Sequence, residues 1–296
     1  MVRFLWHYKP FHQNSVAMKT SRLLLTASAI AALISSCTRN IYAPYCQPVT
    51  LFNQQGEYQI TAAVSDEFFN SGVSNYTDST ASSHRTHLNY ETSGHNFVAQ
   101  GAYAITDYLA VAGGLSLYRK GNKDASNPTD FDAINYGEVA AGYYKPINNQ
   151  FTAEVYAGTG FSSQKHKFST AGWANLKSSK IFIQPNFGYT SPIFDVGASA
   201  RMSYLKYFGL KNNIDATSSS WAMGDHLYMN QIDQNSGFWL LEPTITVRAG
   251  WKFIKATYQL TYLVQLNNHD YILHGHGVAS YRHYVGLTYT FGHKYE

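Results

Sequence analysis

The chain has 296 residues, a formal net charge of +4 and 14% charged residues, against about 25% in typical soluble domains. Aromatic residues make up 16%, and tyrosine alone contributes 24 side chains. Lysine and arginine are scattered rather than gathered into a stripe, which argues against nucleic acid as a partner. Two cysteines are too few for a disulfide framework. Such a tyrosine-rich, charge-poor composition suits a membrane interface, where a ring has one apolar and one wet end.

The N-terminal region carries an export signal. A short basic stretch, Met18-Lys19-Thr20-Ser21-Arg22, precedes an apolar run that is too brief to span a bilayer. The run ends in Ile34-Ser35-Ser36-Cys37, which resembles the lipobox of bacterial lipoproteins, where the cysteine is acylated and becomes the first mature residue. We therefore expect residues 1–36 to be a removed leader and signal peptide, with Met18 as the true start and a covalent lipid on Cys37. A plain secretory signal with an incidental cysteine is the alternative.

Beyond Cys37, no segment approaches the roughly 20 apolar residues that a membrane-spanning helix needs. If the mature chain enters a membrane, it must do so as β-strands. We expect residues 37–56 to form a lipid-anchored periplasmic lead-in and residues 57–296 to form the β-domain. Cys46, in the lead-in, has no internal partner left and is expected to be a free thiol.

Apolar and polar residues alternate with period two in many segments of the remaining chain. The clearest is 253–265, where Ile254, Ala256 and Tyr258 begin an apolar series with polar residues between them. This alternation gives a strand one apolar and one polar face. The ten predicted strands lie near 57–65, 94–105, 109–119, 134–144, 151–161, 180–190, 194–205, 238–249, 253–265 and 278–291.

The connections between these segments are alternately short and long, and the long ones are polar. Outer-membrane barrels have this asymmetry, with short periplasmic turns, longer outer loops and an even number of antiparallel strands. The sequence therefore predicts an all-β fold, an antiparallel up-and-down transmembrane β-barrel of about ten strands. The short connections are Thr106–Tyr108, Lys145–Gln150, Thr190–Ile193 and Gly250–Lys252, and the long ones lie near 66–93, 120–133, 162–179, 206–237 and 266–277.

Aromatic residues flank every short connection, where the periplasmic aromatic girdle of a barrel would lie. The alternative is that the same rings form the core of a soluble β-sandwich. The flanking residues are Tyr103 and Tyr108, Tyr143 and Phe151, Tyr189 and Phe194, and Trp251 and Phe253.

The last predicted strand contains Gly286-Leu287-Thr288-Tyr289-Thr290-Phe291. The spacing of Gly286, Tyr289 and Phe291 resembles the C-terminal signal by which outer-membrane barrels are recognised for assembly. We therefore expect the barrel-assembly machinery to be a partner. Residues 292–296 follow this motif, whereas many such barrels end at the aromatic residue.

Pro185 and Pro243 lie inside predicted strands, although proline cannot donate a backbone hydrogen bond. A closed barrel has no free edge at which to place such a residue. We therefore expect a β-bulge at each proline.

If apolar residues face lipid, the alternate residues face the lumen. This register sends four acidic and four basic residues inward. A barrel of about ten strands is narrow and is largely filled by its own side chains, and burial of an unpaired charge is costly. Opposite charges should pair, which predicts a plugged barrel; the alternative is a thin water channel lined by solvated charges. The eight residues are Glu138, Glu154, Asp195, Arg201, Glu242, Arg248, Lys255 and Arg282.

Two loops contain groups capable of chemistry, without a recognisable motif. Asp225-His226 in the fourth long loop is an acid–histidine neighbour of the kind that ten-stranded outer-membrane proteases have at their rim. The last long loop holds possible ligands for a transition metal, in a spacing that matches no known family. We expect neither a cofactor, other than the lipid, nor catalytic residues. The possible metal ligands are His269, Asp270, His274 and His276.

Several short motifs fall along the mature chain: Ile41-Tyr42-Ala43-Pro44, Leu51-Phe52, Gly56-Glu57, Ile183-Gln184-Pro185-Asn186-Phe187-Gly188, Leu241-Glu242-Pro243 and Arg248-Ala249-Gly250. Together they resemble small outer-membrane barrel lipoproteins common in Bacteroidota. That group has no established biochemical activity. The resemblance therefore implies fold and location more than function, and it makes the two prolines a shared feature of the group.

The expected protein is an outer-membrane barrel with both termini in the periplasm, tethered to the periplasmic leaflet by the lipid on Cys37. We expect a non-catalytic structural, adhesive or accessory subunit of an envelope complex. Its partners would be outer-membrane lipid and a protein bound at the outer loops or the lead-in, where Trp173 and Trp221 suit contact. A narrow diffusion channel and a rim enzyme using the loop histidines are the alternatives.

Overall fold

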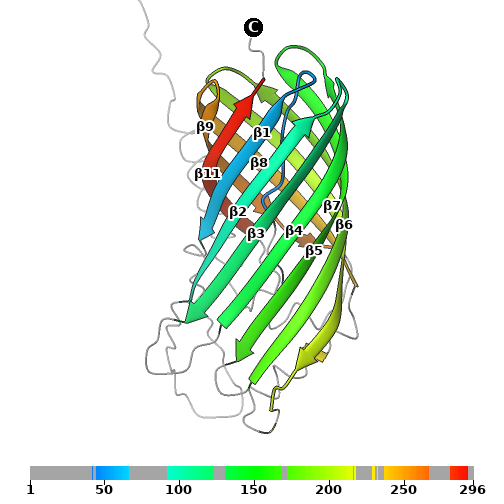
Figure 1. The fold of residues 1–296 in the computed structure, drawn as a ribbon, viewed down its shortest axis with the longest axis vertical. Coiled ribbons are helices and arrows are strands. Elements are labelled where there is room, and N and C mark those ends of the chain that lie inside the picture. The colour runs from blue at the N-terminus through cyan, green and yellow to red at the C-terminus, as the bar shows by residue number, and fades with distance from the viewer. Residues whose placement is uncertain are drawn as a thin grey trace, which may run out of the picture.

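The computed structural model describes residues 42, 45–66, 92–122, 131–168, 172–215, 217, 229–230, 232, 237–266 and 281–292. Their strands belong to one antiparallel sheet (Figure 1). The strands are β1 (Tyr58–Asp66), β2 (Thr92–Ala104), β3 (Leu109–Asn122), β4 (Phe131–Pro146), β5 (Phe151–Phe168), β6 (Gly172–Thr190), β7 (Phe194–Asn212), β8 (Gly237–Trp251), β9 (Ile254–Tyr262), β10 (Val264–Gln265) and β11 (Tyr281–Phe291).

The sheet closes on itself. Each strand from β1 to β8 pairs with the next one in sequence, β11 pairs with both β1 and β9, and β8 pairs with β9. The short β10 continues β9 beyond Leu263, because both pair with β8 in the same register. The eleven strands therefore make a closed antiparallel barrel with ten staves, and the predicted fold class is confirmed.

The barrel wall has a polar, buried inner face and an apolar, exposed outer face. In β9, for example, Lys255, Thr257 and Gln259 are buried, whereas Ile254 and Tyr258 are exposed. This is the reverse of a soluble β-sandwich, which buries its apolar face. Soluble proteins rarely expose a continuous apolar surface larger than a few hundred Å². The outer face therefore suits contact with the hydrocarbon of a bilayer.

Within the described residues, no helix combines the length and apolar character required to cross a membrane.

Strands β5 and β6 are longer than the alternation of apolar and polar residues predicts, so the barrel wall extends further on their side. The predicted long connection at 162–179 is mostly strand, because β5 and β6 leave only residues 169–171 between them. On the outer face of β5, the last apolar residue is Phe161. The next outward positions are polar: Ser163, Lys165 and Lys167. Alternation is lost there because an outward side chain above the hydrocarbon layer need not be apolar. Figure 1 shows β5 and β6 reaching far beyond β1 and β11 at the long-loop end.

The eight predicted girdle residues all lie on the outer face near the short turns. Six are exposed, and Phe151 and Tyr189 are partly buried by neighbouring rings. Tyr108 stacks on Tyr143 with ring centroids 6.0 Å apart. None of these rings points into the lumen, so the alternative of an aromatic sandwich core is excluded.

The prediction of β-bulges at Pro185 and Pro243 is wrong. Among the described strands, the register of β6 on β7 is the same before and after Pro185, and β8 stays in register with β7 where Pro243 pairs with Ala200. The irregularity in the β6–β7 ladder lies instead between Asn175 and Lys177. Both prolines are at outward-facing positions. In the β6–β7 ladder no pair is formed at Gln184 and Pro185. The N–H that proline lacks is therefore not needed there, and no residue has to be inserted.

The inverted wall makes a testable prediction about lipid contact. Val139→Arg, in the middle of the outer face, should lower the free energy of unfolding in lipid vesicles by about 2–4 kcal/mol, because a cation there enters hydrocarbon. Ser163→Arg, on the same face beyond the apolar series, is the control and should cost at most about 1 kcal/mol. Guanidinium titration followed by tryptophan fluorescence measures both. Equal costs would show that the outer face does not contact lipid.

Candidate functional site in the barrel lumen

The lumen is occupied by the chain's own N-terminal residues. Tyr42 and residues 45–52 form no strand, yet all of them are buried within the barrel (Figure 1, blue trace). We call these residues the plug segment. Sequence analysis had assigned them to a lead-in ahead of the barrel, at 37–56. The difference arises because the segment has no periodic pattern, and most of its hydrogen bonds are with residues 54 to 212 positions away in sequence.

The plug segment has no strand partner, so its backbone groups must bond elsewhere. Side chains of the inner wall supply that bonding. The Gln259 side chain accepts from the Gln47 N–H at 2.7 Å and donates to the Gln47 carbonyl at 2.9 Å. Gln184 and Asn186 donate to the Pro48 carbonyl at 2.7 and 3.1 Å. Gln100 donates to the Cys46 carbonyl, and Arg248 to the Val49 carbonyl.

Glu154 binds the plug segment rather than a cation. Its carboxylate accepts the Thr50 hydroxyl at 2.6 Å, the Thr50 N–H at 3.3 Å and the Phe52 N–H at 3.2 Å. The Asn186 amide donates to the same carboxylate at 2.9 Å. Hydrogen bonds to an ionised acceptor are about twice as strong as those between neutral groups. This acid is therefore a principal attachment point for the segment.

A bidentate ion pair crosses the middle of the lumen. The Arg201 guanidinium donates to both Glu138 oxygens, at 2.8 and 2.9 Å. Arg201 Nε and Nη2 also donate to Gln184 Oε1, at 2.9 and 2.7 Å, and Arg201 Cζ lies 4.1 Å from the Phe182 ring centre. Arg201 is completely buried. This pair joins β7 to β4 through the lumen.

Lys180 is a buried lumen charge that sequence analysis missed. Its ammonium lies 3.6 Å from Glu242 and donates to the Tyr42 hydroxyl at 2.9 Å, which in turn donates to Glu242 at 2.7 Å. The signal was present, because Lys180 alternates with outward Ile181 and Ile183 in the way that inward Gln184 does. The predicted strand starts at residue 180, so Lys180 is its first residue and has no preceding alternation. The observed strand β6 starts at Gly172.

The remaining predicted charges also face inward. Lys255 donates to Asp195 and to the Ser191 carbonyl, both at 2.6 Å, and Arg248 lies 4.0 Å from the same carboxylate. The Arg282 guanidinium lies 5.1 Å from the ring centre of Tyr118. All eight residues of the predicted network are therefore buried on the inner wall.

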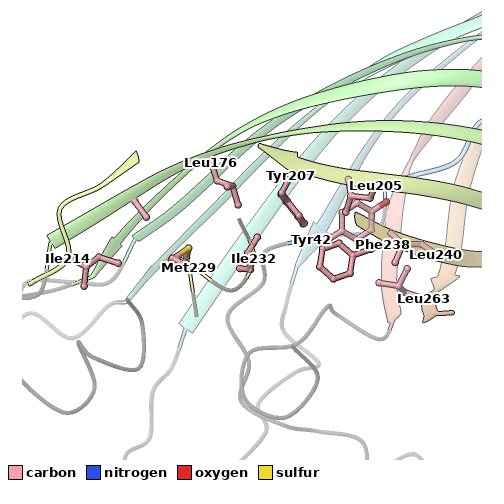
Figure 2. Packing of buried hydrophobic residues seen from close by; sticks show 11 residues of the cluster. Tyr42, Leu176, Leu205, Tyr207, Ile214, Met229, Ile232, Phe238, Leu240 and Leu263 are labelled. Atoms are coloured by element: carbon pink, nitrogen blue, oxygen red, sulfur yellow. The ribbon is translucent and has the colours of Figure 1, made fainter. Parts of the chain in front are cut away.

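Apolar side chains pack together inside the barrel toward the long-loop end. Tyr42 packs there with residues of the inner wall, among them Leu205, Tyr207 and Leu240, and with Leu263 (Figure 2). Three further members of this cluster, Ile214, Met229 and Ile232, come from the connection between β7 and β8. The plug segment and the β7–β8 connection therefore both contribute side chains to the filling of the lumen.

A histidine–carboxylate pair lies in the extended part of the wall and was also missed. His166 Nδ1 is 2.8 Å from Asp132 Oδ1, and its Nε2 is 3.3 Å from Gln164 Oε1. Both residues of the pair are buried. Because both ring nitrogens already have side-chain partners, the pair is arranged to hold β4 against β5 rather than to activate a nucleophile. Alternation of His166 with outward Lys165 and Lys167 could have revealed it.

Several predicted residues lie outside the described part of the chain, and the predictions about them stay predictions. Within the described residues, no three His, Cys, Asp or Glu side chains converge to hold a metal ion. Trp173, the second residue of β6, donates its backbone N–H to the Asn213 side-chain oxygen at 2.8 Å. The predicted functional residues that lie outside the described part of the chain are Cys37, Trp221, Asp225, His226, His269, Asp270, His274 and His276.

The C-terminal motif occupies the closing strand. Tyr289 and Phe291 face outward at the short-turn end, where both rings lie beside Tyr58 of β1. Gly286 lies where a Cβ atom would come within 2.6 Å of the Ala63 backbone. The glycine therefore permits close pairing of β11 with β1, a structural reason for this residue that is independent of any assembly signal.

No family model matches the chain, and no curated protein is significantly similar to it. Among solved structures, the chain is similar to the translocator domain of the autotransporter NalP from Neisseria meningitidis. The two are 10% identical, the match covers 93% of this chain and 97% of that domain, and the TM-score is 0.44. The function must therefore be argued from the lumen itself.

The central ion pair gives a second prediction. Arg201→Met leaves the buried Glu138 carboxylate without its cationic partner and should lower the free energy of unfolding by about 3–5 kcal/mol. Arg201→Met combined with Glu138→Gln should be more stable than Arg201→Met alone, because the uncompensated charge is removed. Lys145→Met, at an exposed position beside a short turn, is the control and should change stability by less than about 0.5 kcal/mol. A double variant no more stable than Arg201→Met would contradict this account.

The fit of the plug segment gives a third prediction. A Cβ atom at Gly197 would lie 2.6 Å from Val49 Cγ1. Gly197→Ala should therefore destabilise the barrel by about 1–3 kcal/mol through overpacking, and adding Val49→Ala should recover most of the loss. Gly101→Ala, where nothing lies within 4 Å, is the control. The temperature at which the folded band disappears on a denaturing gel reports each variant. No recovery by Val49→Ala would mean that the segment does not pack there.

Proposed function

We propose that the protein is an outer-membrane β-barrel lipoprotein that does not conduct and that serves as a structural, adhesive or accessory subunit of an envelope assembly. The observation that carries this proposal is the plug segment, whose backbone is hydrogen-bonded to the inner wall from Gln100 to Gln259. A diffusion channel needs a continuous water path. Here the inward polar groups bind one another and the plug segment, and apolar side chains cover the long-loop end.

Membrane location is supported by the outer wall. The apolar outer face and the aromatic residues beside the short turns match the lipid-facing surface of outer-membrane barrels. By the same comparison, the short turns face the periplasm and the long connections face outward. Lipid on Cys37, and recognition of Gly286, Tyr289 and Phe291 by the assembly machinery, complete the proposal from sequence.

Contact with a protein partner would fall to the long-loop end. The extended wall of β5 and β6 carries outward polar residues, including Lys165 and Lys167, above the apolar series. A partner could pair with such a surface without entering the bilayer. This end therefore suits an adhesive or accessory role.

Conductance in planar bilayers tests the proposal. The wild-type protein should give no current steps, because the plug segment closes the lumen. A variant lacking residues 45–52 should give steps. A milder variant, with Val49, Leu51 and Phe52 replaced by serine, should flicker between closed and conducting states. Heat-dependent gel mobility confirms that each variant is folded.

Two results would contradict the proposal. Steady conductance of the wild-type protein would make it a diffusion channel. Silence of both folded variants would show that the plug segment is not what closes the lumen.

A further inference from the structure

The extended side of the barrel wall carries lysines on its outer face. Five outward-facing lysines lie on β5, β6 and β7 beyond the apolar series, and all five are exposed. Among the described residues, the outward positions of these three strands hold no acidic side chain, and none of the five lysines forms an ion pair. This surface therefore has one sign of charge. The five residues are Lys165, Lys167, Lys177, Lys206 and Lys211.

Three of these lysines form a row that crosses the strands diagonally. Lys165 on β5 pairs with Asn175, which is two residues from Lys177 on β6. Lys177 in turn pairs with Phe208, which is two residues from Lys206 on β7. Diagonal neighbours of this kind on one face of a sheet lie about 7–8 Å apart. Each of the three is therefore a near neighbour of the next, and we call them the lysine row.

The lysine row runs parallel to the edge of the apolar outer face. Toward the short turns, the last outward aliphatic or phenylalanine side chain on each of the three strands is four residues from the lysine of that strand. These residues are Phe161 on β5, Ile181 on β6 and Met202 on β7. Because the offset is the same on each strand, the row and the apolar edge follow the same diagonal. The apolar edge of a barrel follows the plane of the membrane, so the row lies parallel to that plane.

An aromatic pair continues the row onto β8. Trp239 is two residues from Gly237, the partner of Lys206, so it is the next residue on the same diagonal. Its side chain is exposed on the outer face, and its ring centroid lies 5.1 Å from that of Tyr204. Outward tryptophan and tyrosine rings are enriched at the headgroup level of membranes. The pair therefore marks the headgroup layer at the height of the lysine row.

The dimensions of β5 agree with this placement. Phe151 beside the short turn and Phe161 are ten residues apart, which gives about 25 Å of height at a tilt of about 40°. The apolar band of an outer-membrane barrel is about 25 Å tall. Lys165 lies four residues further on, about 10 Å higher at the same tilt, and the headgroup layer adds about 5–8 Å to each side of the hydrocarbon. A flexible lysine stem bends to keep its ammonium among polar groups, so the row reaches the headgroups.

We propose that the lysine row binds anionic lipids through the phosphate groups of their headgroups, in the leaflet at the long-loop end. An ammonium group binds phosphate as a compact point charge. Near an anionic membrane surface, each lysine strengthens the attraction by about fivefold. Contact with a membrane, and the identity of this leaflet as the outer one, rest on the proposed function; the geometry of the row does not.

Binding of this kind would be confined to one side of the barrel. In the described parts of β8, β9 and β11, the outward positions carry no lysine or arginine. Anionic lipid would therefore gather beside β5, β6 and β7, where the wall is extended (Figure 1). A protein partner at this end would then meet the residues beyond the row, such as Lys167 and Lys211, rather than the row itself.

Fluorescence quenching by brominated lipids tests the proposal. The full-length protein is reconstituted into phosphatidylcholine vesicles with a minor fraction of brominated phosphatidylglycerol or, for comparison, brominated phosphatidylcholine. The background is Trp251→Phe, which removes the exposed tryptophan beside a short turn and leaves Trp239 as the reporter next to the row. Comparing the two lipids gives the association constant of phosphatidylglycerol relative to phosphatidylcholine. Heat-dependent gel mobility shows that each variant has folded.

The test variant is Lys165→Gln with Lys177→Gln. Its relative association constant for phosphatidylglycerol at low salt should be about tenfold below that of the background protein. The control is Lys145→Gln with Lys252→Gln, which removes the same charge from exposed lysines at the short turns and should change the constant by less than about twofold. Added salt should weaken the preference of the background protein, because the contact is electrostatic.

Three results would overturn the lipid site. The background protein would show no preference for phosphatidylglycerol, or the test and control variants would lose it equally. Alternatively, inorganic phosphate at constant ionic strength would abolish the preference, which would make the row a site for free phosphate. A folded protein that neither lipid quenches would instead refute the membrane location in the proposed function, so the two failures are distinguishable.

Discussion

The backbone of the plug segment must find hydrogen-bond partners without belonging to a strand, and the inner wall is organised by that requirement. An unpaired N–H or C=O group in a water-poor lumen is costly. The wall supplies amide side chains that both donate and accept, as Gln259 does for Gln47. Glutamines and asparagines suit this task because they carry no net charge to desolvate. Glycines such as Gly197 make room on the wall for apolar side chains of the segment, in this case Val49.

Charged residues in the lumen serve the same packing. Replacing a buried ion pair by apolar groups is often neutral or stabilising, so stability alone is a weak explanation for Arg201 and Glu138. Their geometry is more informative, because Arg201 also fixes Gln184, which bonds to the Pro48 carbonyl. Glu242 likewise receives Tyr42 while it faces Lys180. Arg201 therefore positions a group that binds the plug segment, and Glu242 binds the segment directly. Conformational specificity is therefore the physical role that this arrangement supports.

The strands were predictable from sequence because lipid imposes a period-two rule on the outer face, which is clear in Ile254, Ala256 and Tyr258. The rule fails above the hydrocarbon, so the extended parts of β5 and β6, with His166 and Lys180, were partly missed. At Pro185 the alternation is unbroken, which agrees with the absence of an inserted residue at that position. The rule cannot identify the plug segment either, because partners such as Gln47 and Gln259 are far apart in sequence and follow no local period.

A closed barrel hardly needs a lipid in order to stay in the membrane. All its strand hydrogen bonds are satisfied within the sheet, and its outer face is already apolar, so acyl chains add little to an insertion that is effectively irreversible. The plug segment is different, because it is held by separate side-chain contacts and continues from β1 as a single thread. The position of the segment in the lumen therefore depends on these side-chain contacts and not on the ladder hydrogen bonds that close the sheet.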